Sequence, residues 1–286
     1  MLNVLNHGFR KEGVSNVVSL IMIAGIIISL LGMVFATYLP AWGKDIEVQT
    51  LNGMMDSFMD MKTGIDTLAV GSDPGSSYTT KFTLGSEGGP IFGFGRMSGS
   101  IELDDERGLV SVQDQFGTTY SQGRGALIYR SNTINVEDQF ITLEAGAIIR
   151  EQSQKAILKG SPNIVLRTDQ DTGDLTLYMM AITIEGNDQS FSGTGSYLAR
   201  TTLLSSQPSE YELDALTVIS IEITTGYQSL WTDLFTEMAQ ENSLVDGVDY
   251  SISNGNDANG NPSVTLTLNT LDVIDIRTSI YQLEID

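Results

Sequence analysis

Residues 17–39 read VVSLIMIAGIIISLLGMVFATYL, and this stretch decides how the rest of the chain is interpreted. It lies within a run of thirty residues, 14–43, that carries no charged side chain. A helix of that length would reach about 45 Å, because each residue adds about 1.5 Å. The apolar core of a bilayer is only about 30 Å thick. The pattern therefore predicts one membrane-spanning helix over residues 17–39, with membrane lipid as its partner.

The residues that flank the apolar run predict its orientation. A basic pair at 10–11 precedes it, and short basic segments stay on the cytoplasmic side. Tyr38 and Trp42 lie at the other end, where amphipathic rings favour the headgroup region. No later apolar run is long enough to cross a bilayer. We expect a single-pass protein of the cell membrane with a cytoplasmic leader, residues 1–13, and an extracellular region, residues 44–286.

The composition is strongly acidic, with 36 Asp and Glu against 15 Lys and Arg and a formal net charge of −21. The leader contains two basic residues and one acid, so the rest holds 13 basic residues against 35 acids, a net charge of −22. Nucleic acids and anionic lipid surfaces are bound by basic patches, so we expect no nucleic-acid partner. The chain has no cysteine, which excludes disulfides and thiol nucleophiles. The outer region must therefore be stabilised by burial of its core.

The leader differs from a secretory signal peptide, whose apolar region is about 7–15 residues long and ends at a small-residue cleavage site. Instead, the segment RKEGVSNVV at residues 10–18 resembles the class III signal of archaeal type IV pilins and related surface proteins. The resemblance implies that a prepilin-type peptidase cuts on the cytoplasmic side, between Gly13 and Val14, and leaves the apolar helix at the new N-terminus. Glu12 departs from the pattern, because it separates the basic pair from Gly13. An uncleaved signal anchor is the alternative.

Four small residues in the apolar run fall on one helical face: Gly25, Ser29, Gly32 and Ala36. Such a strip lets two helices approach closely in lipid, where no hydrophobic driving force brings them together. The strip predicts a packing surface for other pilin-like subunits. Glycine and alanine are also common in membrane helices that pack against nothing.

A second pattern continues the helix beyond the membrane, to about residue 70. Apolar residues alternate at spacings of three and four over an amphipathic stalk, residues 44–69, and we expect the helix to bend near Pro40. We call these residues the stalk stripe: Leu51, Met54, Phe58, Met61, Ile65 and Leu68. The stripe is expected to pack against the protein's own sheet.

Residues 71–286 are predicted to form an extracellular β-rich domain. A turn cluster at 71–77 ends the helix, and short segments of period-two alternation follow, separated by Gly, Asp and Ser. This spacing is typical of a sandwich or barrel of antiparallel sheets, as one domain or two. A single helix is predicted over residues 227–241, with Trp231 and Phe235 on its apolar side. The predicted fold class is mainly β with a long N-terminal helix packed on a β-sandwich-like ectodomain.

Further stretches of the outer region resemble a group of archaeal pilin-like membrane proteins whose role is unassigned. They are, in order, residues 124–129, 140–150, 192–195 and 227–231. This resemblance implies the topology of a long helix on a β-domain. It supplies no active site, so no functional residue is carried over from it.

Candidate catalytic and metal-binding residues are sparse. The single histidine, His7, lies in the leader, which excludes histidine-based catalysis and His/Cys zinc sites from the outer region. Calcium takes oxygen ligands, and one acidic loop offers Asp169, Asp171 and Asp174. A second loop spans residues 254–260. Neither loop fits the EF-hand pattern, and a hairpin turn is the preferred interpretation of both. We expect no cofactor.

These observations favour a structural role over an enzymatic one. The first hypothesis is a pilin-like subunit, minor or accessory, of an archaeal cell-surface filament. The second is a permanently anchored surface ectodomain that binds an envelope partner or a glycan. An anchored extracellular hydrolase is a third and unfavoured hypothesis, which would need a pair of acids converging in a cleft.

Overall fold

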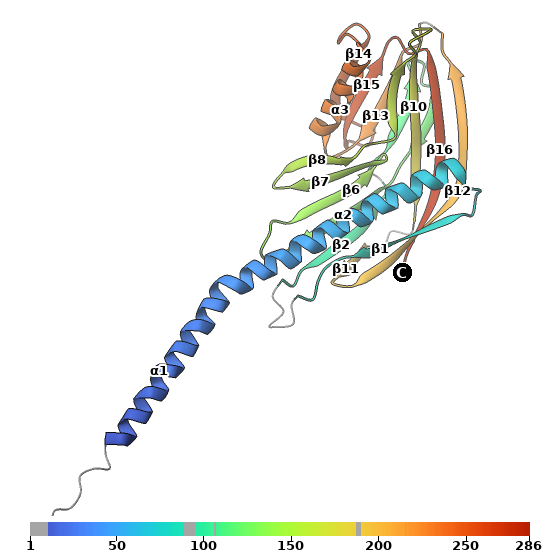
Figure 1. Ribbon diagram of the computed structural model, residues 1–286. Helices are drawn as coiled ribbons and strands as arrows, with labels where there is room; N and C mark the ends of the chain where they lie inside the picture. The colour runs from blue at the N-terminus through green and yellow to red at the C-terminus, as the bar shows by residue number, and fades with distance from the viewer. Residues whose placement is uncertain (1–10, 89–94, 106, 187–189, 215) are drawn as a thin grey trace, which may run out of the picture.

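The computed structural model describes residues 11–88, 95–105, 107–186, 190–214 and 216–286. Its N-terminal part is one continuous helical rod. The rod consists of α1 (Lys11–Met33), the π-helical segment η1 (Val34–Tyr38) and α2 (Leu39–Gly71). Figure 1 shows α1 projecting away from the strands, whereas α2 lies across them.

The rod changes direction where η1 joins α2 (Figure 1). Proline lacks a backbone N–H, and its ring clashes with the carbonyl four residues earlier, so Pro40 disturbs the helical bonding ahead of it. The N–H of Leu39 donates to the carbonyl of Val34, five residues back, which is the π-helical pattern. The Thr37 hydroxyl donates to the Met33 carbonyl at 2.7 Å. The bend expected near Pro40 therefore takes the form of a widened turn just before it.

The remaining described chain forms three sheets and one further helix. The first sheet, which we call sheet A, has the strand order β1 (Ser77–Thr83), β12 (Ser196–Glu212), β16 (Val273–Ile285), β10 (Leu175–Glu185) and β9 (Ile164–Thr168). Sheet B has the order β11 (Ser190–Gly193), β2 (Ser98–Asp104), β5 (Ala126–Asn132), β6 (Gln139–Glu144), β7 (Ala147–Gln152) and β8 (Lys155–Gly160). Sheet C has the order β14 (Tyr250–Asn256), β15 (Pro262–Leu268), β13 (Ile219–Thr224), β3 (Val110–Asp114) and β4 (Thr119–Gly123).

Strand pairing is antiparallel in every named pair of these sheets except one. Strands β10 and β16 run parallel in the middle of sheet A, with Leu177 beside Ile274 and Ile182 beside Ser279. A parallel pair needs a long crossover connection, and here the chain between the two strands builds β11 to β15 and α3 (Gln228–Glu241). The predicted fold class, mainly β and mostly antiparallel with a long N-terminal helix, is confirmed. The described strands form three sheets.

One apolar core lies under α2. All six residues of the stalk stripe are buried, and they pack with residues of sheets A and B. Phe58 meets Phe82 of β1 edge to face, with ring centroids 5.4 Å apart. Tyr281 of β16 is also buried here, and its hydroxyl donates to the Ile65 carbonyl at 2.9 Å. The expectation that the stripe packs against the protein's own strands is confirmed.

A second core lies between sheet C, parts of sheet A and α3. Trp231, Phe235 and Met238 of α3 are buried in it, together with Leu177 of β10 and Ile221 of β13. Burial of large side chains such as these contributes about 1.5–3 kcal/mol each. The β-rich region thus has two cores, which share the central strands of sheet A.

Polar contacts fix both ends of α2 to the sheets. At the start, Glu47 is fully buried, and its carboxylate accepts from the backbone N–H groups of Ile134, Asn135 and Val136 at 2.8–3.2 Å. The side-chain amide of Asn135 adds a bond of 2.7 Å. At the end, the Ala69 carbonyl accepts from Ser206 and Arg277. The last carbonyls of a helix lack intrahelical partners, so these bonds also cap α2.

Replacing Glu47 with alanine should destabilise the attachment of α2. The substitution removes a buried carboxylate and leaves three backbone N–H groups without this acceptor, and we expect the free energy of unfolding to fall by about 3 kcal/mol. Denaturant unfolding of the detergent-solubilised chain measures this change. Asp45, exposed on the same helix, supplies the control Asp45→Ala, which should leave stability nearly unchanged. Equal stability of Glu47→Ala and the parent chain would contradict the assigned role.

Candidate functional site

The most conspicuous surface of the molecule is α1. Its large apolar side chains are exposed along the whole segment from residue 17 to residue 33, with exposed fractions between 50% and 69%. Soluble proteins rarely leave a continuous apolar surface of this extent uncovered. By length and composition, the described chain has one helix that can cross a membrane, near the N-terminus; a signal sequence has the same properties. The exposed apolar surface indicates an anchoring role for this helix.

The predicted packing strip lies open on this helix. A Cβ atom built on Gly25 or Gly32 would meet nothing within 4 Å in the described chain, so the backbone is accessible at both positions. Ser29 and Ala36 are exposed as well. Ala36 lies in η1, whose wider turn displaces it from the line through the other three. The strip is therefore most regular from residue 25 to residue 32.

The predicted processing site begins the rod. Gly13 and Val14 belong to the backbone of α1. Their side chains, and all of residues 1–10 including His7, lie outside what the structure describes. The proposed cleavage between Gly13 and Val14 stays a prediction.

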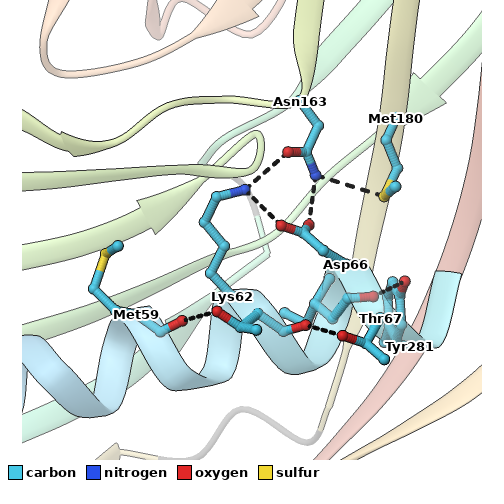
Figure 2. A network of polar contacts seen from close by, with 9 residues as sticks. Met59, Lys62, Asp66, Thr67, Asn163, Met180 and Tyr281 are labelled. Atoms are coloured by element: carbon cyan, nitrogen blue, oxygen red, sulfur yellow. Dashed lines mark hydrogen bonds and ion pairs between the residues drawn. The ribbon is translucent and has the colours of Figure 1, made fainter. Parts of the chain in front are cut away.

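A polar network attaches the middle of α2 to the strands. Figure 2 shows Lys62 reaching from the helix toward Asn163, which directly precedes β9. The Lys62 ammonium donates to Asn163 Oδ1 at 2.8 Å and to Asp66 Oδ2 at 3.0 Å. The Asn163 amide donates to Asp66 Oδ1 at 2.6 Å, and its nitrogen lies 3.6 Å from the sulfur of Met180. Three different functional groups, an amine, a carboxamide and a carboxylate, thus contact one another in pairs.

The first acidic loop is a hairpin turn between β9 and β10. The Asp169 carboxylate accepts from the backbone N–H groups of Asp171 and Thr172 at 2.7 and 3.0 Å, and these bonds lower its pKa. The Asp169 N–H donates to the Asp174 carbonyl, and Gly173 has a φ of +82°. Asp169 therefore serves the turn itself. Within the described ranges, no three His, Cys, Asp or Glu side chains are arranged to hold a metal ion.

The second loop, residues 254–260, has the same character. Asp257 accepts from the N–H groups of Asn259 and Asn261 at 2.9 and 2.8 Å, and from the Thr224 hydroxyl at 3.1 Å. Hydrogen bonds to the ionised carboxylate outweigh its burial and lower the pKa of Asp257. Gly260 has a φ of +89°, as a tight turn requires. Asp257, like Asp169 in the first loop, stabilises the turn between two strands.

A polar cleft of about 460 Å³ lies on the face of sheet B away from α2. The cleft is lined by both acids and arginines, with Phe140 and Tyr227 as its aromatic walls. The Arg130 guanidinium lies over the Phe140 ring, 4.9 Å from its centroid. A second hollow of about 400 Å³ shares Ser100 and Arg130 with this cleft, so the two form a continuous polar groove.

A buried acid lies where β6 meets α3 and also lines a small void next to Lys62. Glu144 of β6 is fully buried, and its Oε1 accepts from the Thr225 hydroxyl at 2.5 Å and from the Trp231 indole at 3.0 Å. Its other oxygen, Oε2, has no hydrogen-bond partner among the described residues. Burial raises the pKa of Glu144, while the bonds from Thr225 and Trp231 and the charge of Arg107 oppose the shift. Glu144 thus joins β6 to α3 through the bond from Trp231.

The burial of both acids, Glu47 and Glu144, could have been predicted from their positions in the sequence. Glu47 continues the stalk stripe by one more step of four residues, so its burial follows from its register. Glu144 interrupts the apolar segment ITLEAGAII, residues 141–149, where a lone acid predicts a buried carboxyl. The contact between Lys62 and Asn163 has no such signal, because 101 positions separate the two residues.

Comparison with known proteins places the chain in a family without adding an activity. Neither curated proteins nor solved structures gave a match. One family model matches residues 12–274, which covers nearly all of the rod and strands β1 to β15 and ends two residues into β16. Since this match extends over far more than half of the chain, the protein belongs to the family of unknown function DUF7289.

Proposed function

We propose that this protein is a pilin-like structural subunit, minor or accessory, of an archaeal cell-surface filament. The observation that carries the proposal is that the two halves of one continuous helix differ in their burial. Its first half, α1, is apolar and exposed, and its second half, α2, is buried against the sheets. A helix built in this way holds a folded domain at a fixed distance from whatever surrounds α1.

The proposed mechanism is mechanical. The apolar half is held in the membrane until assembly, and then moves into a bundle of equivalent helices at the filament core. Both environments cover the same exposed apolar surface of α1, so little apolar area is exposed to water in the exchange. The polar contacts of Glu47, Lys62 and Ala69 would transmit force from the helix to the strands.

The leader should be removed before assembly. We expect the mature protein to begin at Val14, and Gly13→Leu to retain the leader because the peptidase requires a small residue before the cleaved bond. Intact-mass measurement of protein purified from membranes decides both points. Gly8→Leu is the matched control and should be processed like the parent chain. A parent chain that keeps its leader would contradict the filament proposal and favour a permanent anchor.

Enlarging the packing strip should weaken self-association of α1. The double variant Gly25→Leu and Gly32→Leu fills the surface on which two backbones approach, so we expect dimer signal in vesicles to fall at least about tenfold, which corresponds to about 1.4 kcal/mol. Energy transfer between labelled chains in vesicles measures the association. Ala24→Leu, a small-to-large change off the strip, is the control. An unchanged double variant would remove the strip from the proposal.

The second candidate function is a permanently anchored ectodomain that binds an envelope glycan or protein. The polar groove of sheet B favours it, since alternating carboxylates and guanidinium groups beside an aromatic ring can bond and stack on a polyhydroxylated ligand. This candidate does not require cleavage or assembly.

Binding to surface polysaccharides from an archaeal envelope distinguishes this second candidate. If the groove is the site, Arg130→Ala and Phe140→Ala should each weaken binding about tenfold or more, because each removes a lining contact. Arg167→Ala, on an exposed position of β9, should bind like the parent chain. Equal binding by all three variants, or none by the parent, would count against a ligand in the groove.

A further inference from the structure

The network of Lys62, Asp66 and Asn163 carries an inference beyond attachment of the helix. Lys62 and Asp66, four residues apart on α2, already form an ordinary helical ion pair. Here the amine also contacts a carboxamide from a distant part of the chain, and the same carboxylate contacts both groups. Figure 2 shows the three side chains converging in the space between α2 and the strands.

The positions of the atoms suit a reaction between the amine and the amide. Lys62 Nζ lies 2.8 Å from Asn163 Oδ1, the oxygen bonded to the carbonyl carbon Cγ. A rotation of either side chain is enough to bring Nζ against Cγ, because the C=O bond is only about 1.2 Å long. Reacting groups held at about 3–3.5 Å react far faster than the same groups free in water.

The surroundings also favour the reaction. The Lys62 side chain is only 12% exposed, and it lines a small void of about 10 Å³ together with apolar side chains of α2, β6 and β10 and the buried acid Glu144. The Lys62 amine is therefore held against Asn163 with little access to bulk water. The Asp66 carboxylate contacts both other groups, one through each of its oxygens, and its side chain is 35% exposed.

We propose that Lys62 and Asn163 form an intramolecular isopeptide bond, promoted by Asp66. The Asp66 carboxylate takes a proton from the Lys62 ammonium, and the freed electron pair of Nζ attacks Cγ of Asn163. The Cγ–Nδ2 bond then breaks. Asp66 returns its proton to the departing nitrogen, and one of the two protons left on Nζ passes to the same leaving group, while the other stays as the amide N–H. One ammonium and one carboxamide become one secondary amide and one ammonium ion, with no oxidant, reductant or cofactor.

The bond would join α2 to the start of β9 across 101 positions of sequence. The chain contains no cysteine, so a disulfide cannot supply a covalent tie between the helix and the sheets. An amide bond serves in both reducing and oxidising surroundings. It would make the contact between anchor and domain resistant to forces that break hydrogen bonds.

Mass spectrometry of the purified full chain tests the proposal. The mature protein should be lighter than its sequence by one ammonia, and protease digestion should yield a branched peptide that contains both Lys62 and Asn163. Lys62→Arg, Asn163→Ala and Asp66→Ala should each restore the full mass of their sequence. Lys44→Arg, an exposed position on the same helix, is the matched control and should keep the loss of ammonia.

Two further results distinguish the bond between Lys62 and Asn163 from a loss of ammonia at another residue. The variant Asn163→Asp has a different leaving group, so it should lose one molecule of water in place of ammonia, or remain unlinked. A linked Asn163→Asp product that still loses ammonia would overturn the mechanism. Loss of ammonia elsewhere, for example by cyclisation at another asparagine, leaves peptides with unmodified Lys62 and Asn163. Such peptides, or a parent chain with its full sequence mass, would overturn the proposal even if every variant folds poorly.

Discussion

Burial of the stalk stripe against sheets A and B is the interaction on which the rest of the structure depends. It fixes the direction of the rod, because six consecutive contacts over five helical turns leave α2 no freedom to rotate. Since α1 continues the same backbone through η1, the orientation of the apolar half follows from packing far from it. The hydrogen bonds of Glu47, Lys62 and Ala69 fix the register of α2 on the strands at three positions along the same face.

The two halves of the rod suit different solvents. In α2 the apolar residues occupy one stripe and the polar residues face water, whereas α1 is apolar on every side. The change between the two regimes coincides with η1 and Pro40, where the helix is wider and bends. A rigid connection with one defined bend can present the β-rich region at a constant angle to the surroundings of α1.

The long helix and its two regimes could be predicted from sequence because both depend on local periodicity. The spacing of Leu51, Met54 and Phe58 specifies a buried face, whatever covers it. Trp231 and Phe235 identify the buried side of α3 in the same way. The parallel pairing of β10 with β16 and the meeting of Lys62 with Asn163 could not be predicted, since each joins residues far apart in the chain. Period-two alternation locates strands but does not choose their neighbours.

The position of β16 has a consequence for biosynthesis. This strand lies between β12 and β10, and both apolar cores include its residues. A ribosome makes it after every other strand in sheet A, so the sheet has a gap at its centre until residues 273–285 have emerged. The nascent polypeptide therefore cannot complete its tertiary structure stepwise from the N-terminus. Both apolar cores can therefore close only after this last strand of sheet A has been made.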